Sequence, residues 1–169
     1  MKTSHERRPD VITAAKAATL SGLFQQRVAR TPDLTAYRQF DEPSGQWRSV
    51  SRRQAAEQVR RWERPLAAIG LAPGERVAVQ LRNCLERVCY EQAALALGLV
   101  VVPLYPNDSP GNVVYILSDS DSRVLRRAIW SGSSRAIPCS SRPWWWARGN
   151  RSSPRWSFSR LRHGRRWRG

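Results

Sequence analysis

Acidic residues and lysine are missing from large parts of this sequence. None of the 13 Asp and Glu residues lies beyond Asp121, and lysine occurs only at Lys2 and Lys16. Residues 1–122 carry 16 basic residues against those 13 acids, whereas residues 123–169 hold 13 arginines and six of the eight tryptophans. Residues 123–169 therefore carry +13 of the formal net charge of +16, and residues 1–122 carry the remaining +3. A chain that is basic throughout, as many polyanion-binding proteins are, is excluded.

Histidine and cysteine are too few and too scattered to indicate a metal centre. His5 and His163 lie far apart, and the three cysteines have none of the C-x-x-C spacing of metal or redox sites. Cys84 and Cys89 lie five positions apart in a segment with a helical pattern, which favours buried free thiols acting as small apolar residues. We expect no metal site, and the free thiols fit a reducing cytoplasm.

Long apolar runs are absent as well. The longest, near Leu99 to Leu104, is far too short to cross a bilayer, and no apolar stretch of signal-peptide length follows the charged residues 1–10. We therefore expect a soluble cytoplasmic chain. Its 169 residues and 41% hydrophobic content suffice for one domain with an ordinary core.

Two helices with a hairpin between them are predicted first along the chain. Apolar residues at helical spacing predict a helix over about 19–30, which the Thr31-Pro32 pair ends because a residue before proline avoids the α region. Two short strands, 36–40 and 46–50, flank the turn-forming residues 41–45.

The second of these helices has a clear start signal. Ser51 and Gln54 match a capping box, in which each side chain satisfies a backbone amide at the helix start. Pro65 predicts a kink, and Gly70 a C-terminal stop. One apolar stripe runs along the helix through Ala55, Val59, Trp62, Leu66 and Ile69.

From residue 71 strands and helices alternate. Valine-rich strands are predicted at 77–81 and 99–104. Between them Asn83 and Glu86 match the capping pattern of a helix start, and the helix stops at Gly98. Ser109-Pro110 opens a further helix, and Ser122 to Leu125 begins another strand. The run 99–104 is typical of a central strand covered on both faces.

This alternation predicts the fold class α/β, as the N-terminal part of a doubly wound, mostly parallel sheet domain with a short hairpin. Such sheets bind ligands at the carboxyl ends of their strands. The loops after Leu81 and after Leu104 are therefore the expected ligand positions, and neither is rich in glycine.

The segment from Arg126 onward has a different composition. Apolar periodicity ends, and arginines without counter-charges cannot be buried in a core. Three interpretations stay open: an out-of-frame (frameshift) translation of GC-rich DNA, a tail whose arginines and tryptophans contact nucleic acid or an anionic membrane, or a folded element with no recognisable pattern. In each case we expect residues 126–169 to be disordered. We expect the same of residues 1–17, so that residues 18–125 form the folded part.

Five short motifs, in their order and spacing, carry a resemblance to a known family. Over roughly residues 18–125 the chain resembles the AMP-forming acyl-CoA synthetases, and in particular long-chain fatty acid CoA ligases. The opening Trp47 to Ser51 segment and the helix after it are similar to the same family. The motifs are Gly74 to Val79, Asn83, Ala93 to Gly98, Val102 to Pro106 and Val114 to Ser120.

The resemblance implies an ATP-dependent ligase that joins a fatty or other carboxylic acid to AMP, with magnesium, and then to coenzyme A. That chemistry needs a glycine- and hydroxyl-rich phosphate loop and a lysine near the acyl phosphate. Ser131 to Ser134 lacks the threonines and the following lysine of that loop, and neither Lys2 nor Lys16 lies in a context like the catalytic lysine. We therefore assign no catalytic, cofactor-binding or metal residue, and expect no cofactor bound by this chain alone.

Three hypotheses for the function follow. The first is a truncated piece of such a ligase, a fragment inactive alone. The second is a non-enzymatic binding protein whose basic Arg/Trp tail contacts nucleic acid or an anionic membrane. The third is an α/β interaction module that shares the fold without the chemistry.

Overall fold

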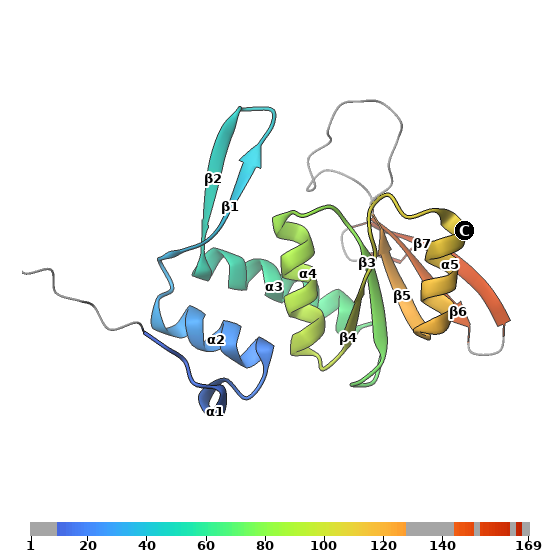
Figure 1. Ribbon diagram of the computed structural model, residues 1–169, viewed down its shortest axis with the longest axis horizontal. Coiled ribbons are helices and arrows are strands. Elements are labelled where there is room, and N and C mark those ends of the chain that lie inside the picture. Colours follow the sequence, from blue (N-terminus) through green and yellow to red (C-terminus); the bar gives the residue numbers. More distant parts are fainter. Residues whose placement is uncertain (1–9, 128–143, 151–152, 163–164, 167–169) are drawn as a thin grey trace, which may run out of the picture.

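A computed structural model (Figure 1) describes residues 10–127, 144–150, 153–162 and 165–166, and only the backbone from 144 onward. Among these residues no helix is both long and apolar enough to span a bilayer. The elements in chain order are α1 (Ala14–Ala17), α2 (Leu20–Arg30), β1 (Thr35–Asp41), β2 (Gln46–Ser51), α3 (Arg52–Ala67), β3 (Arg76–Gln80), α4 (Leu85–Ala96), β4 (Val100–Pro103), α5 (Pro110–Asp119), β5 (Ser122–Arg127), β6 (Trp144–Asn150), β7 (Ser153–Arg162) and β8 (Arg165–Arg166).

The predicted hairpin and the helices beside it are confirmed. Strands β1 and β2 pair antiparallel and project from the body of the molecule (Figure 1). The capping box that opens α3 is complete, because Ser51 Oγ accepts from Gln54 N at 3.2 Å while Gln54 Oε1 accepts from Ser51 N at 2.9 Å. The apolar stripe of α3 faces the core through Ala55, Val59 and Leu66, which are at most 5% exposed.

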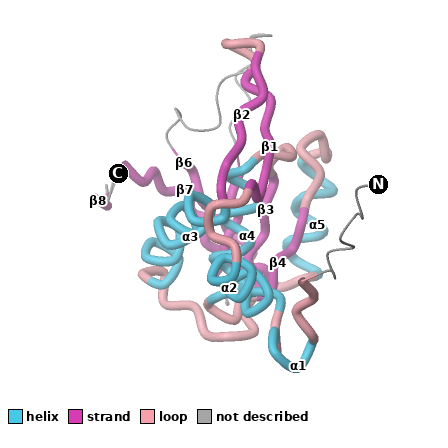
Figure 2. Tube along the Cα trace, turned by 90° about the vertical axis from the view of Figure 1, so that its left-hand side faces the viewer, coloured by secondary structure: helices cyan, strands magenta, loops and turns pink. Residues whose placement is uncertain are grey.

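The larger sheet has the strand order β4-β3-β5-β6-β7-β8, and its first three strands are parallel. Strand β3 leads through α4 to β4 on one side, and β4 leads through α5 back across β3 to β5 on the other. These two crossovers run in opposite directions along the sheet. Because both connections are expected to be right-handed, α4 and α5 must lie on opposite faces of the sheet. Figure 2 shows α5 on the opposite side from α3 and α4, so the predicted doubly wound α/β class is confirmed.

The prediction that 99–104 forms a central strand is wrong. Among the described strands β4 lies at the edge of the sheet and pairs only with β3, and Val100 on it is 48% exposed. Among the three parallel strands the middle one is β3, whose residues Val77, Ala78 and Val79 are fully buried. A run of branched aliphatics signals burial of side chains on both faces, but strand order depends on where β5 pairs, which such a run does not encode.

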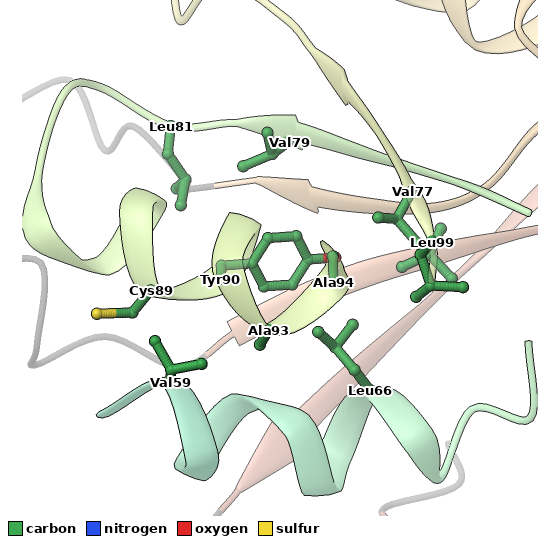
Figure 3. Close-up of a cluster of buried hydrophobic side chains, with 11 residues drawn as sticks. Val59, Leu66, Val77, Val79, Leu81, Cys89, Tyr90, Ala93, Ala94 and Leu99 are labelled. Carbon is green, nitrogen blue, oxygen red and sulfur yellow. The ribbon is translucent and has the colours of Figure 1, made fainter. Parts of the chain in front are cut away.

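Two hydrophobic clusters hold the sheet between its helices. The larger joins α3 and α4 to one face, through residues that include Val59, Val77, Cys89 and Tyr90 (Figure 3). The smaller joins α5 to the other face through Val113 and Leu117. Each fully buried Val or Leu side chain contributes about 1.5–3 kcal/mol, so these clusters are the main source of the fold's stability.

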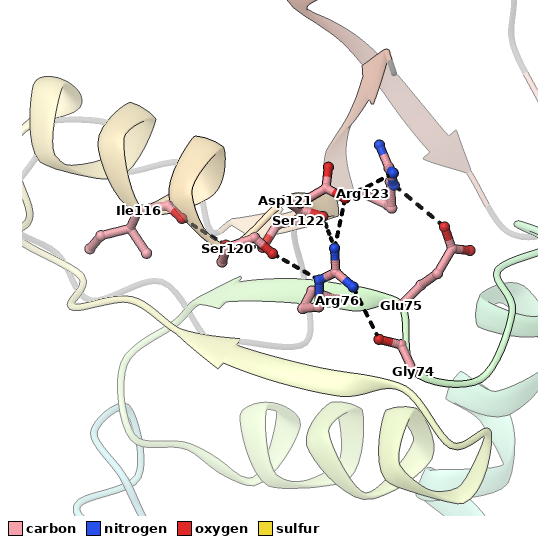
Figure 4. Close-up of polar contacts among 8 residues, drawn as sticks. All are labelled: Gly74, Glu75, Arg76, Ile116, Ser120, Asp121, Ser122 and Arg123. Carbon is pink, nitrogen blue, oxygen red and sulfur yellow. Dashed lines mark hydrogen bonds and ion pairs between the residues drawn. The ribbon is translucent and has the colours of Figure 1, made fainter. Parts of the chain in front are cut away.

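Ion pairs fasten the amino ends of β3 and β5 (Figure 4). Arg76 donates to Asp121 Oδ2 at 2.7 Å and to Ser120 O at 2.8 Å, and Arg123 donates to Asp121 Oδ2 at 2.9 Å. Glu75 lies 3.4 Å from Arg123 on its other side. Asp121, which adopts φ +47°, therefore fixes the tight turn from α5 into β5.

Two segments that were expected to be disordered contain described structure. Residues 10–17 include α1, and Asp10 forms ion pairs with Arg27 and Arg30 of α2. These two guanidiniums, Arg30 foremost, hold the pKa of the Asp10 carboxyl below its usual value. Residues 1–9 lie outside the described part of the chain.

Within the Arg/Trp-rich tail, strands β6, β7 and β8 follow β5 in antiparallel order. Strand β5 also continues through Arg127, two residues past the expected end of the domain at Leu125. Tryptophan and phenylalanine have high strand propensity, which favours strands in this segment despite its many arginines. The prediction of disorder at 128–143, 151–152, 163–164 and 167–169 concerns residues outside the described ranges.

Candidate functional site

The carboxyl ends of β3 and β4 form the position where this sheet type binds ligands. The loop after β3 leads to α4 on one face, and the loop after β4 leads to α5 on the other. Adjacent strands whose loops diverge in this way leave a crevice between them. The structure thus brings together the two loops that the sequence singled out, after Leu81 and after Leu104.

Gln80 is the last residue of β3, and its side chain joins the carboxyl ends of β3 and β4. Its side chain is buried, with the residue 3% exposed, and Nε2 donates to Tyr105 O at 3.0 Å. Gln80 Oε1 has no hydrogen-bond partner among the described residues. Sequence reasoning overlooked this residue, although a single amide in the apolar run Val77 to Leu81 is itself a signal.

The polar side chains at the mouth of the crevice are committed to partners within the chain. Asp108 accepts from Tyr105 N at 2.9 Å and from Asn112 Nδ2 at 2.8 Å, which closes the loop after β4. Arg82, in the loop after β3, lies 3.5 Å from Glu42 at the hairpin turn. These contacts fix loop shape, and the described groups here include no paired nucleophile and base.

A buried charge pair lies behind this edge, on the α4 side. Arg126 of β5 forms an ion pair with Glu86 in the first turn of α4, and its guanidinium lies over the Trp62 ring at 4.7 Å. The Arg126 side chain is 4% exposed and that of Glu86 10%. Arginine is therefore buried here because Glu86 supplies the counter-charge that the sequence argument found missing near Arg126.

The neighbours of this pair are also buried. Tyr90 packs edge-on against Trp62 with ring centroids 5.7 Å apart. Burial raises the pKa of the Tyr90 hydroxyl, and the nearby Arg126 charge partly opposes that rise. At neutral pH the tyrosine is therefore protonated and forms part of the core.

The hairpin contributes to this region in a way that the sequence did not predict. The N-cap of α4 is Cys84, which makes no capping hydrogen bond with its side chain, and not Asn83 as the pattern suggested. Gln39 of β1 instead accepts from Leu85 N at 2.8 Å. A side chain 46 positions away therefore satisfies one of the amides at the start of α4.

Potential metal ligands do not gather at one place in the described part of the chain. Within residues 10–127 no group of three or more His, Cys, Asp and Glu side chains could hold a metal ion. Lys16 lies exposed on α1, while Lys2 and the Ser131 to Ser134 segment lie outside the described residues. Cys84 and Cys89 are free and buried, as predicted, and Cys139 is outside the described residues.

Comparison with known proteins gives this arrangement a family. The family model described as "AMP-binding enzyme" matches residues 24–137, about two thirds of the chain. That range takes in the hairpin, α3 and the whole β3-α4-β4-α5-β5 unit. The chain belongs to this family of adenylate-forming enzymes.

Particular relatives lie within the same family. The chain is 36% identical over 103 residues to the long-chain-fatty-acid–CoA ligase FadD13 of Mycobacterium tuberculosis, which is 61% of this chain and 20% of the ligase. It is 34% identical over 109 residues to the phosphinothricin tripeptide synthetase PhsB of Streptomyces viridochromogenes, covering 64% of this chain and 9% of that protein. The chain thus spans about a fifth or less of the length of these curated relatives.

Solved structures agree with the fold. The N-terminal domain of FACL13 from Mycobacterium tuberculosis, crystallised with an inhibitor, superposes with a TM-score of 0.56 and 31% identity, over 63% of this chain and 26% of that chain. The NpsA N-terminal subdomain of Klebsiella oxytoca superposes with a TM-score of 0.57 and 26% identity, over 63% of this chain and 26% of that chain. The β3-to-β5 unit is therefore a portion of an adenylate-forming N-terminal domain.

Proposed function

We propose that this chain is the opening part of an ATP-dependent acyl-CoA synthetase that activates a fatty acid, and that it forms no acyl-adenylate alone. The observation that carries the proposal is the similarity to FadD13 and FACL13, which covers only about a fifth to a quarter of those chains, together with the family match over residues 24–137. In the intact enzyme, ATP with magnesium activates the acid and coenzyme A receives the acyl group.

The described side chains support a scaffolding role for this part. Adenylation needs donors aimed at phosphate oxygens and a metal that bridges them. At the carboxyl edge of the sheet, Gln80 ties β4 to β3, Asp108 closes its own loop, and Arg82 reaches the hairpin. These contacts build one wall of a domain whose reactive groups come from elsewhere.

ATP–pyrophosphate exchange tests the proposal. The purified chain is incubated with ATP, magnesium, labelled pyrophosphate and fatty acids of several lengths, beside full-length FadD13 as the positive control. We expect exchange with the control and background counts with this chain. Exchange that depends on a fatty acid and on this chain would refute the claim of inactivity.

The basic tail favours a second candidate function. Residues 123–169 carry 13 arginines and no acid, a composition that binds nucleic acid or anionic lipid through charge neutralisation. On this proposal the affinity for a DNA duplex or for phosphatidylserine vesicles falls steeply with salt and disappears when residues 128–169 are deleted. Affinity that survives the deletion would exclude the tail as the binding segment.

The reading frame decides between the frameshift origin of the tail and a binding tail. If the DNA just past the Leu125 codon encodes a phosphate loop in a shifted frame, the tail is a frameshift product. If no shifted frame encodes such a loop, the binding tail becomes the better proposal. Either result leaves the family of the matched residues unchanged, because most of the match lies before that point.

A further inference from the structure

Helix α5 exposes two large hydrophobic side chains on its outer face, in addition to those that it buries on its inner face. Val113 and Leu117 face the core and are 7% and 3% exposed. Val114 and Tyr115 on the outer side are 55% and 67% exposed. Asp119, the last residue of the helix, is its only charged side chain.

The outer face of α5 is defined here as Gly111, Val114, Tyr115 and Ser118. These positions follow the i, i+3, i+4, i+7 spacing of one helical face, and all four are exposed. A helix on the surface of a soluble domain normally carries charged residues there, as α3 does with Arg60, Arg61 and Arg64 among others.

The neighbouring edge of the sheet shows the same incomplete burial. Val102 of β4 packs with the α5 cluster, so Val100, two residues earlier, points to the same side of the sheet. Val100 is nevertheless 48% exposed, and β3 is the one strand of the described part of the chain that pairs with β4. The α5 side therefore offers an apolar helix face beside an open strand edge.

We propose that the outer face of α5 is the docking surface for the remaining part of an adenylate-forming domain. This inference rests on the proposed function. The matched part covers only 26% of the FACL13 N-terminal domain, so the larger part of such a domain is available to pack against it. An uncharged face suits an apolar partner surface, whereas the arginine-rich outer face of α3 suits solvent.

Co-purification tests the surface. The full chain is co-expressed with a tagged Mycobacterium tuberculosis FadD13 that lacks the N-terminal fifth to which this chain is similar. We expect the wild-type chain to co-purify. The amount of the double variant Val114→Arg/Tyr115→Arg that co-purifies should be about tenfold lower or less, because two charges enter an apolar interface. Gly111→Arg is a second variant, since a Cβ at Gly111 meets nothing within 4 Å and so leaves the free chain undisturbed.

Leu34→Arg is the matched control. Leu34 is 57% exposed, a fraction similar to the 55% of Val114, and it lies in the turn between α2 and β1. These two elements are on the other side of the molecule from α5 (Figure 1). This variant should co-purify like the wild type. Circular dichroism melts of all variants alone separate loss of docking from loss of folding.

Three results would overturn the proposal. The first is that the wild-type chain fails to co-purify, and the second is that the Val114→Arg/Tyr115→Arg and Gly111→Arg variants co-purify as well as the wild type. The third is that the wild-type chain sediments as a homodimer and Val114→Arg makes it a monomer, because a second copy of the chain would then occupy this surface. Adenylation by the chain alone is a separate result, which refutes the proposed function and not the docking surface.

Discussion

Arg126 and Glu86 form an ion pair inside the core, which joins the carboxyl end of strand β5 to the first turn of helix α4. The carboxylate also lies at the positive end of the α4 dipole, which favours its charged form. The pair joins the third parallel strand to the α3–α4 layer. Its burial means that neither charge can be removed singly without leaving the other in an apolar setting.

Glu86→Gln should therefore destabilise the fold strongly. We expect a loss of about 3–5 kcal/mol in the free energy of unfolding, measured by urea denaturation, because Arg126 keeps its charge without the carboxylate. The double change Glu86→Leu/Arg126→Leu should recover most of that loss. Glu91→Gln is the control, since the Arg87–Glu91 pair is an i,i+4 pair worth about 0.5 kcal/mol or less. Equal costs for the two single variants would show that the buried pair is not required.

Gln39→Ala should weaken the attachment of the hairpin to the body. Gln39 Oε1 accepts from Leu85 N, so its removal leaves an amide at the start of α4 without that acceptor. We expect a loss of about 1 kcal/mol in unfolding free energy. Gln46→Ala, an exposed position on β2, should cost almost nothing. If both glutamines cost the same, the cap contributes nothing.

Cys89 gives a pH-dependent prediction. Burial, with smaller contributions from Cys84 and Glu86, raises the pKa of the Cys89 thiol from 9.0 to about 12. At pH 8 it should react with a disulfide reagent only as fast as the chain unfolds.

The same shift makes folding stability depend on alkaline pH. Because the folded pKa exceeds the unfolded one, the contribution is complete below about pH 9 and is lost as pH rises toward 12. Denaturation at several pH values should show that Cys89→Val flattens this alkaline decline. Rapid labelling of native Cys89 at pH 8 would contradict the prediction.

Gly98 and Gly45 form a matched pair for backbone geometry. Both adopt positive φ, +71° and +64°, which costs any other residue about 1–2 kcal/mol. A Cβ at Gly98 would lie 3.1 Å from Pro73 Cβ, whereas one at Gly45 meets nothing within 4 Å. Gly98→Ala should therefore lower the unfolding free energy by about 1 kcal/mol or more beyond Gly45→Ala. Equal losses would show that the turn before β3 adjusts freely.

Local signals in the sequence predicted most of the elements. The Ser51–Gln54 capping box, the Ser109-Pro110 helix start and the hairpin all depend on residues within a few positions of each other, and all are present. The resemblance to the ligase family, which rested on short motifs from Trp47 to Ser120, was confirmed by the family match.

Features that depend on distant residues could not be predicted in this way. The edge position of β4 follows from the pairing of β5 with β3, and Arg126 is buried because of Glu86, 40 positions earlier. Gln39 caps a helix 46 positions away. Each needs the three-dimensional arrangement before its partner is known. The absence of catalytic and cofactor residues remains a prediction, since the phosphate-loop segment lies outside the described residues.

Trapping of an acyl-adenylate is the most direct measurement of whether these 169 residues can carry out the family's first reaction. The purified chain is mixed with ATP, magnesium, a fatty acid and hydroxylamine, and acyl hydroxamate is measured by mass spectrometry beside full-length FadD13. We expect hydroxamate from FadD13 and none above background from this chain. Hydroxamate that requires this chain, ATP and the acid would show that it contains a complete adenylation site.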